Sequence, residues 1–178
     1  AADIATDFGV LPNAIQVIPN GVDTELFRAL PDVTRKSDQL IATASADAPL
    51  KGLAVLLQAF KLLSVDRPAL QLMLIASPKP GGDTEALISQ LQLGDRIHFV
   101  GGVSHADIVR LYAESTVAVV PSLYEGFGLP AVEAMASGIP LVSSDGGALA
   151  EVVGDGGLLV PAGDANALAE AVDAVLSD

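Results

Sequence analysis

The sequence contains no cysteine and only two histidines, which excludes several kinds of chemical site. Without cysteine there is no disulfide, no thiolate zinc site and no cysteine nucleophile, and two histidines are too few for a histidine-rich metal cage. Basic residues are also scarce: nine Lys and Arg against 22 Asp and Glu leave a formal net charge of −13. Such a surface repels the phosphate backbone of nucleic acids, so DNA and RNA are not expected partners.

Aromatic residues and long hydrophobic runs are rare as well. Aromatic side chains make up 4% of a chain that is 51% hydrophobic, which is typical of the aliphatic core of a parallel sheet. The apolar runs are far shorter than the roughly 20 residues of a membrane-spanning helix, and no signal peptide is visible at the start. A length of 178 residues predicts one domain and excludes a complete two-domain enzyme.

What is present is a regular alternation of short apolar runs and helical patterns. The runs, bounded by Gly, Pro, Asp or Asn, occur at residues 15–18, 40–44, 70–76, 97–100, 117–120, 139–143 and 158–160. They are continuously apolar, as strands buried on both faces are. Helices are predicted between them at residues 53–63, 84–91, 104–113, 130–137 and 165–176. This order predicts an α/β, Rossmann-like three-layer domain with a parallel sheet of about six strands and helices on both faces.

Two regions of the chain have different expected roles. Residues 1–20 differ in character from the rest, and we interpret them as a lead-in from a segment further upstream. In a parallel α/β sheet, ligands bind outside the carboxyl ends of the strands, so the loops that follow strands are the candidate binding sites.

The loop after the run at 117–120 is the richest of these. Gly126 and Gly128 allow the backbone to approach a ligand closely, and Pro130 suits the first turn of a helix. A strand, a glycine loop and a helix N-terminus together form an anion site, with free N–H groups and the positive end of the helix dipole aimed at the ligand. The same glycines also fit a plain strand-to-helix turn.

Two carboxylates favour the binding interpretation. Glu125 and Glu133 are eight residues apart, which would be ~12 Å along a helix, whereas the carboxylate pair of a retaining glycosidase is ~5 Å apart. We therefore expect each to accept hydrogen bonds from a separate hydroxyl-bearing part of one ligand. A nucleoside diphosphate sugar has a diol at each end and an anion between them.

Residues 125–140 (EGFGLPAVEAMASGIP) resemble the E-x7-E signature of retaining GT-B glycosyltransferases, specifically group 1, or family 4. The resemblance extends over essentially the whole chain, through residues 19–23, Lys51-Gly52, 99–101, Pro121-Ser122 and 154–160. It implies the C-terminal, donor-binding domain of a metal-independent, cofactor-free transferase whose N-terminal acceptor domain is absent. It further implies a cytoplasmic location, with any peripheral membrane association confined to the full-length protein.

The resemblance also implies roles for individual residues. Glu125 would lie near hydroxyls of the donor sugar, orienting it without acting as a nucleophile, and Glu133 would bind the ribose hydroxyls. Lys51 would hold the donor diphosphate and stabilise its charge as the glycosidic bond breaks. Backbone groups would complete the site: those of Gly126, Phe127, Gly128 and Leu129 near the sugar and phosphate, and those of Phe99, Val100 and Gly101 near the base.

One position departs from the family pattern. Many relatives carry an Arg six residues before the lysine, where this chain has Ser45, which can donate a hydrogen bond to phosphate but brings no charge. Lys79, in the loop after the next strand, is a candidate replacement. Most lysines are solvated surface charges, so Lys51 alone would not indicate a function, and Asp145-Gly146-Gly147 either faces the ligand or forms a simple turn. We expect His98 to be a packed core residue and His105 to be solvated.

Two functions from different classes remain open. The first is a glycosyltransferase donor domain, and the second is a non-catalytic module that binds a nucleotide sugar or another partner with the same fold, to which Ser45 gives some support. An NAD-linked or P-loop enzyme is disfavoured, because neither G-x-G-x-x-G after a first strand nor G-x-x-x-x-G-K-[ST] occurs.

Overall fold

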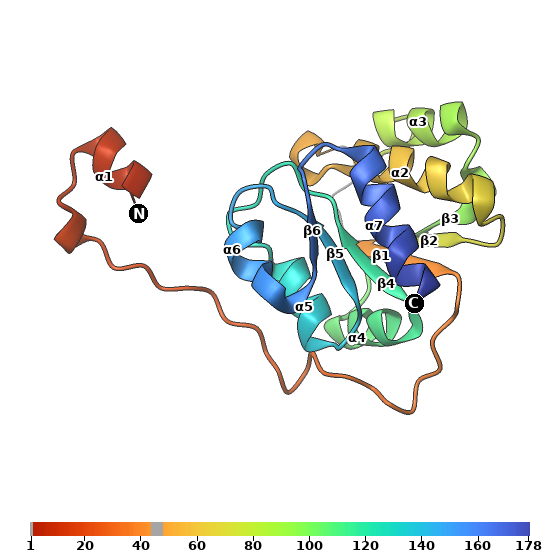
Figure 1. Ribbon diagram of the computed structural model, residues 1–178, viewed down its shortest axis with the longest axis horizontal. Helices are drawn as coiled ribbons and strands as arrows, with labels where there is room; N and C mark the ends of the chain where they lie inside the picture. Colours follow the sequence, from red (N-terminus) through yellow and green to blue (C-terminus); the bar gives the residue numbers. More distant parts are fainter. Residues whose placement is uncertain (1, 44–47) are drawn as a thin grey trace.

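The computed structural model describes residues 2–43 and 48–178 (Figure 1). Within them, one all-parallel sheet has six strands in the order β3-β2-β1-β4-β5-β6. The strands are β1 (Gln39–Thr43), β2 (Gln71–Ile75), β3 (Ile97–Val100), β4 (Val117–Val120), β5 (Leu141–Ser144) and β6 (Leu158–Val160). The predicted fold class is confirmed.

Helices cover both faces of the sheet and bury two separate cores (Figure 1). One face packs against α2 (Leu53–Asp66), α3 (Asp83–Leu91) and α7 (Ala165–Ser177). The other packs against α4 (His105–Glu114), α5 (Leu129–Ala136) and α6 (Leu149–Val153). In β1, Leu40 and Ala42 enter the first core and Ile41 the second. The central strands β1 and β4 are buried on both faces, because successive side chains point into opposite layers that helices cover.

Helix α4 shows how local sequence fixes an element boundary. The Ser104 hydroxyl accepts a hydrogen bond from the Asp107 backbone N–H at 3.2 Å, and the Asp107 carboxylate accepts one from the Ser104 N–H at 3.0 Å. This reciprocal capping box satisfies two backbone donors at the helix start. It also lowers the pKa of Asp107, chiefly through the Ser104 hydroxyl.

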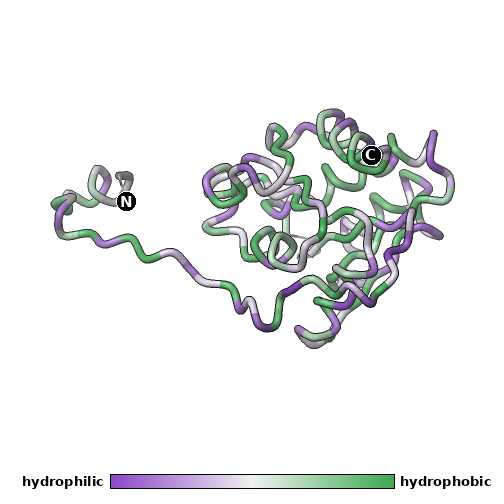
Figure 2. The backbone as a smooth tube through the Cα atoms, turned by 60° about the horizontal axis from the view of Figure 1, so that its bottom comes forward, coloured by the Kyte–Doolittle hydropathy of each residue, from purple (hydrophilic) through white to green (hydrophobic). Residues whose placement is uncertain are grey.

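The N-terminal arm lies away from the domain (Figure 1) and consists of α1 (Ala2–Phe8), a short 3-10 turn, η1 (Pro12–Ala14), and an extended segment. The strand predicted at residues 15–18 is wrong, because this segment pairs with no strand in the described chain, and Val17 and Ile18 are exposed. An apolar run becomes a strand only where another strand satisfies its backbone groups. Hydrophobic positions recur along the arm (Figure 2), and the chain joins the second core at Phe27, which is buried.

Candidate functional site

The sheet order creates a topological switch point between β1 and β4. From β1 the chain proceeds outward to β2 and β3, and then returns to the other side of β1 to build β4, β5 and β6. Helix α2, which follows β1, and helix α5, which follows β4, pack on opposite faces of the sheet. In an open α/β sheet, the crevice outside the carboxyl ends of the strands at such a switch point is where ligands bind. Two short segments border this crevice: the 3-10 turn η2 (Pro49–Lys51) after β1, and residues 121–128 after β4.

An ion pair joins these two segments. Lys51 Nζ lies 2.6 Å from Glu125 Oε1, with side chains 34% and 11% exposed. The same carboxylate oxygen accepts a hydrogen bond from Ser122 Oγ at 3.0 Å, and Ser122 itself is buried. The structure thus brings together two of the predicted site residues from positions 74 residues apart. The sequence resemblance included Ser122 without assigning it a role.

Gly52 explains why Lys51 can reach the crevice. Its φ of 66° lies in the left-handed region, and a Cβ at this position would overlap the Pro121 carbonyl oxygen. Only glycine permits both the conformation and the close approach of the start of α2 to the end of β4. The Leu123 N–H donates to the Leu50 carbonyl at 2.9 Å and fastens the two segments together.

The Asp145-Gly146-Gly147 loop holds the Glu125 backbone in place. Glu125 N–H donates to the Gly146 carbonyl at 3.3 Å, and the Glu125 carbonyl accepts from the Ala148 N–H at 2.9 Å. A Cβ on Gly146 would lie 2.6 Å from the Ser122 and Leu123 carbonyl oxygens, and one on Gly147 would overlap the Glu125 backbone. These two glycines therefore have a structural function, the close packing of one loop on another.

The residues before α5 present unpaired backbone donors. Gly128 is the N-cap of α5 in the left-handed region, with a φ of 96°, and Pro130 occupies the first turn as predicted. The N–H groups of Gly126, Phe127 and Gly128 have no acceptor among the described residues. Unpaired N–H groups at a helix N-terminus can donate hydrogen bonds to an anion or to hydroxyl oxygens of a ligand.

Glu133 lies in α5 and differs from Glu125 in its surroundings. It is half-buried, and its carboxylate has no hydrogen-bond partner in the described part of the chain. Burial raises its pKa, and the charge of His105 partly counters this effect. Burial likewise raises the pKa of the nearby Tyr112, whose hydroxyl donates to the Pro130 carbonyl at 3.4 Å. A half-buried carboxylate without a donor is poised to accept hydroxyl groups from a ligand.

The residues predicted to contact a base lie at the end of β3, at the same edge of the sheet. Phe99 and Val100 are partly buried, and Gly101 is exposed. A Cβ on Gly101 would overlap the Ser77 hydroxyl, while the nearest backbone atom would lie at an ordinary contact distance of 3.6 Å.

The remaining candidates have mixed outcomes. Ser45 falls outside the described residues. Lys79 is exposed in the loop after β2, and its role as a phosphate ligand stays a prediction. The expectation for His98 is wrong: it is exposed, because β3 is an edge strand, and its Nε2 lies 2.8 Å from Gln71 Oε1. His105 is exposed as predicted, with its ring centroid 6.1 Å from that of Phe27.

Comparison with known proteins decides the family. The sequence profile of the family Glycosyl transferases group 1 matches residues 30–178. The chain belongs to this family. It is 50% identical over 157 residues to the MMP alpha-(1->4)-mannosyltransferase of Mycolicibacterium hassiacum, a match that covers 88% of this chain and 38% of the relative. The chain thus spans well under half of the length of that mannosyltransferase.

Solved structures of glycosyltransferases agree with this assignment. The C-terminal domain of a group 1 family glycosyl transferase from Francisella tularensis superimposes with a TM-score of 0.75 at 26% identity, covering 89% of both chains. Anabaena Alr3699/HepE in complex with UDP and glucose gives 0.81 at 25% identity, covering 97% of this chain and 50% of that one. The predicted half of a GT-B fold is confirmed.

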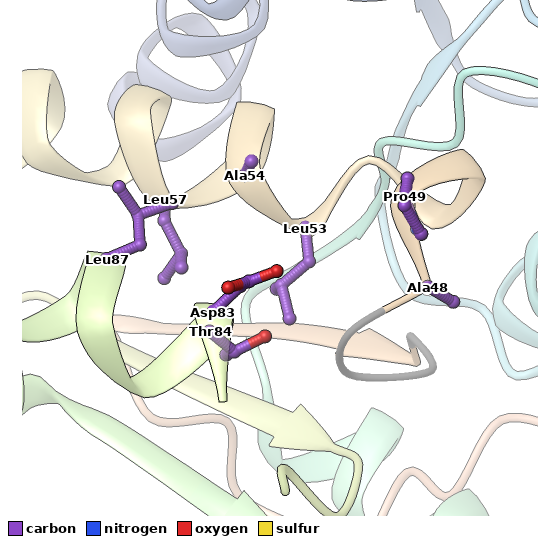
Figure 3. A pocket seen from close by; sticks show the side chains of 8 residues that line it. All are labelled: Ala48, Pro49, Leu53, Ala54, Leu57, Asp83, Thr84 and Leu87. Atoms are coloured by element: carbon purple, nitrogen blue, oxygen red, sulfur yellow. The ribbon is translucent and has the colours of Figure 1, made fainter. Parts of the chain in front are cut away.

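A small, mostly apolar pocket of ≈ 210 Å³ lies between α2 and α3 (Figure 3). Leu53 and Leu57 of α2 and Leu87 of α3 form its apolar wall, while Asp83 and Thr84 supply its polar edge. Two of its lining residues, Pro49 and Leu53, flank Lys51 in the sequence.

The described residues contain no group of three or more His, Asp or Glu side chains placed to hold a metal ion. None of the helices in the described part of the chain has the length and apolar character needed to cross a bilayer.

Proposed function

We propose that this group 1 glycosyltransferase domain binds a nucleoside diphosphate sugar at the β1–β4 switch point and supports metal-independent transfer of the sugar to an acceptor. Transfer proceeds with retention of anomeric configuration, in the cytoplasmic synthesis of a glycan, polysaccharide or glycolipid. The observation that carries the proposal is the convergence of Lys51 and Glu125, from opposite sides of the switch point, beside the open N–H groups before α5.

The chemistry of these groups matches the parts of the donor. Lys51 is the cation at the crevice, and with the positive end of α5 it stabilises the charge that develops on the departing diphosphate. This positive charge replaces a divalent metal in our proposal. Glu125 orients the sugar hydroxyls, and the unpaired carboxylate of Glu133 accepts the ribose hydroxyls. Ser45, Phe99, Val100 and Gly101 complete the donor site.

Transfer also requires an acceptor site, which we assign to a domain upstream of this chain. The proposal rests on the length of the relatives, since the chain covers 38% of the mannosyltransferase and 50% of the Anabaena protein. We propose that the 178-residue chain binds donor without appreciable transfer. The full-length protein should transfer sugar and be indifferent to a metal chelator. An acceptor product with the anomeric configuration of the donor, measured by NMR, would support retention, whereas inversion would refute it.

Binding is tested by thermal denaturation and calorimetry with UDP, GDP and ADP and their glucose and mannose conjugates. A ligand present at 100 times its Kd stabilises the native state by about 2.7 kcal/mol, which raises the melting temperature of a domain of this size by roughly 5–11 °C. Absence of a shift with every nucleotide at millimolar concentration would contradict the proposal.

Two variants test the contacts to the ribose and to the donor sugar separately. Glu133→Ala should weaken binding of the free nucleoside diphosphate and of its sugar conjugate alike, because both carry the ribose. Glu125→Ala should spare the free nucleotide and weaken only the conjugate. Glu170→Ala, which removes an exposed carboxylate from α7, controls for net charge. Equal losses for both ligands in both variants would show that the division of roles is wrong.

A further inference from the structure

Glu125 has two donors on one oxygen and none on the other. Oε1 accepts from Lys51 Nζ at 2.6 Å and from Ser122 Oγ at 3.0 Å. No group among the described residues donates to Oε2. The carboxylate is therefore anchored through Oε1, and Oε2 is left to accept hydroxyl groups from a ligand.

The two anchors respond differently to a bound diphosphate. Lys51 is 34% exposed at the end of a flexible side chain, and in the proposed function it turns toward the ligand phosphates. Its contact with Glu125 then weakens, because one ammonium is shared between two anions. Ser122 is 3% exposed, so the packing around it keeps its side chain from turning toward the ligand.

The Ser122 backbone is held as firmly as its side chain. Ser144, itself buried, donates its hydroxyl to the Ser122 carbonyl. A Cβ on Gly146 would lie 2.6 Å from this same carbonyl, so the loop after β5 packs directly against it. The Ser122 hydroxyl is consequently a fixed donor, three residues before the carboxylate that it serves.

We propose that Ser122 is a positioning residue, which holds Glu125 Oε1 in place when Lys51 leaves it for the donor diphosphate. The assignment rests on the proposed function and adds to it that Lys51 and Ser122 have different roles once the donor is bound. In the ligand-free chain Lys51 and Ser122 share the anchoring of Glu125. In the donor complex Ser122 alone anchors Glu125. Without the Ser122 hydroxyl, the Glu125 side chain would regain rotamers that weaken its contact with the sugar.

The experiment compares Ser122→Ala with the parent chain, using the nucleoside diphosphate and sugar conjugate that bind the parent most tightly. Calorimetry should give an unchanged Kd for the free nucleotide, within about twofold, because Lys51 and Glu133 remain. The Kd of the conjugate should rise about tenfold, the loss expected for one hydrogen bond to a charged group. Melting temperatures without ligand should change little, because Lys51 still anchors Glu125 in that state.

Ser64→Ala is the matched control. Ser64 is 6% exposed in α2, its hydroxyl donates to the Lys61 carbonyl within the same helix, and it lies away from the crevice. This variant should leave both affinities unchanged. A second comparison adds Glu125→Ala to Ser122→Ala: once the carboxylate is gone, removing the hydroxyl should have no further effect on conjugate binding.

The possible results distinguish failure of the proposed function from failure of the role proposed for Ser122. If the parent binds no nucleotide or conjugate, the proposed function is wrong and the role of Ser122 is wrong with it. If the parent binds the conjugate and Ser122→Ala binds it equally well, only the role of Ser122 is refuted. Equal weakening of nucleotide and conjugate by Ser122→Ala would also refute it, because that pattern indicates a distorted loop.

Discussion

The contact between Gly52 and Pro121 gives a quantitative prediction about how the site is built. Replacing Gly52 by Ala adds one methyl group with two consequences. The residue must keep a φ of 66°, which costs a residue with a Cβ about 1–2 kcal/mol. The new carbon also overlaps the Pro121 carbonyl oxygen, and forcing a methyl group into packed structure costs about 1–3 kcal/mol more.

Gly102→Ala separates these two contributions. Gly102 has nearly the same conformation, with a φ of 67°, but a Cβ there would meet no heavy atom within 4 Å. Alanine also lowers the conformational entropy of the unfolded chain, which stabilises the fold of both variants by about 0.4–1 kcal/mol and offsets part of these costs. We expect a destabilisation of about 1 kcal/mol for Gly102→Ala and about 2–4 kcal/mol for Gly52→Ala.

Urea denaturation followed by circular dichroism measures both values, and thermal melts should agree. For a domain of this length the melting temperature should fall by about 2–4 °C for Gly102→Ala and by about 4–16 °C for Gly52→Ala. Equal destabilisation of the two variants would refute the argument, since it would mean that the close approach of α2 to β4 is not required for stability.

Three further predictions concern charge and capping. Lys51→Ala should raise the Kd of a nucleoside diphosphate at least about tenfold in calorimetry, whereas Lys36→Ala, which removes an exposed pair with Glu114, should leave it unchanged. Burial raises the pKa of Glu133 above 4.5, so its ionised form destabilises the fold at neutral pH and this cost vanishes as the pH falls below the unfolded value. Glu133→Gln should therefore raise the melting temperature at about pH 7 and give no gain below about pH 4. Ser104→Ala should cost about 1 kcal/mol by removing the cap of α4, a loss of about 2–4 °C in a thermal melt.

The sequence was most informative where local rules decide the structure. Six of the seven apolar runs became strands of the sheet, because each of these runs pairs with a neighbouring strand. The helix predicted at residues 104–113 is α4, and its start is fixed locally by the capping box between Ser104 and Asp107, three residues apart. The start of α5 after Gly128 followed from the glycine and the proline in its first turn.

The features that the sequence did not predict share one physical cause: each depends on residues that are distant in the sequence. The run at 15–18 has strand composition but no neighbouring strand, and His98 is exposed because β3 has a neighbour on one side only. The Lys51–Glu125 ion pair depends on the β1–β4 adjacency, which spacing along the chain does not encode. Sequence reasoning placed both charged residues at the sheet edge without predicting that they meet.

The adjacency of β1 and β4 also has a consequence for folding. The strands β1, β2 and β3 form one continuous half of the sheet, and β4, β5 and β6 form the other. Each half contributes one member of the Lys51–Glu125 pair, so neither half alone can form it. Pairing β1 with β4 requires contacts between residues far apart in the sequence, and such contacts form slowly. The ion pair therefore forms late in folding: a partly folded intermediate with only one half intact would have the helices and strands of that half but no Lys51–Glu125 pair.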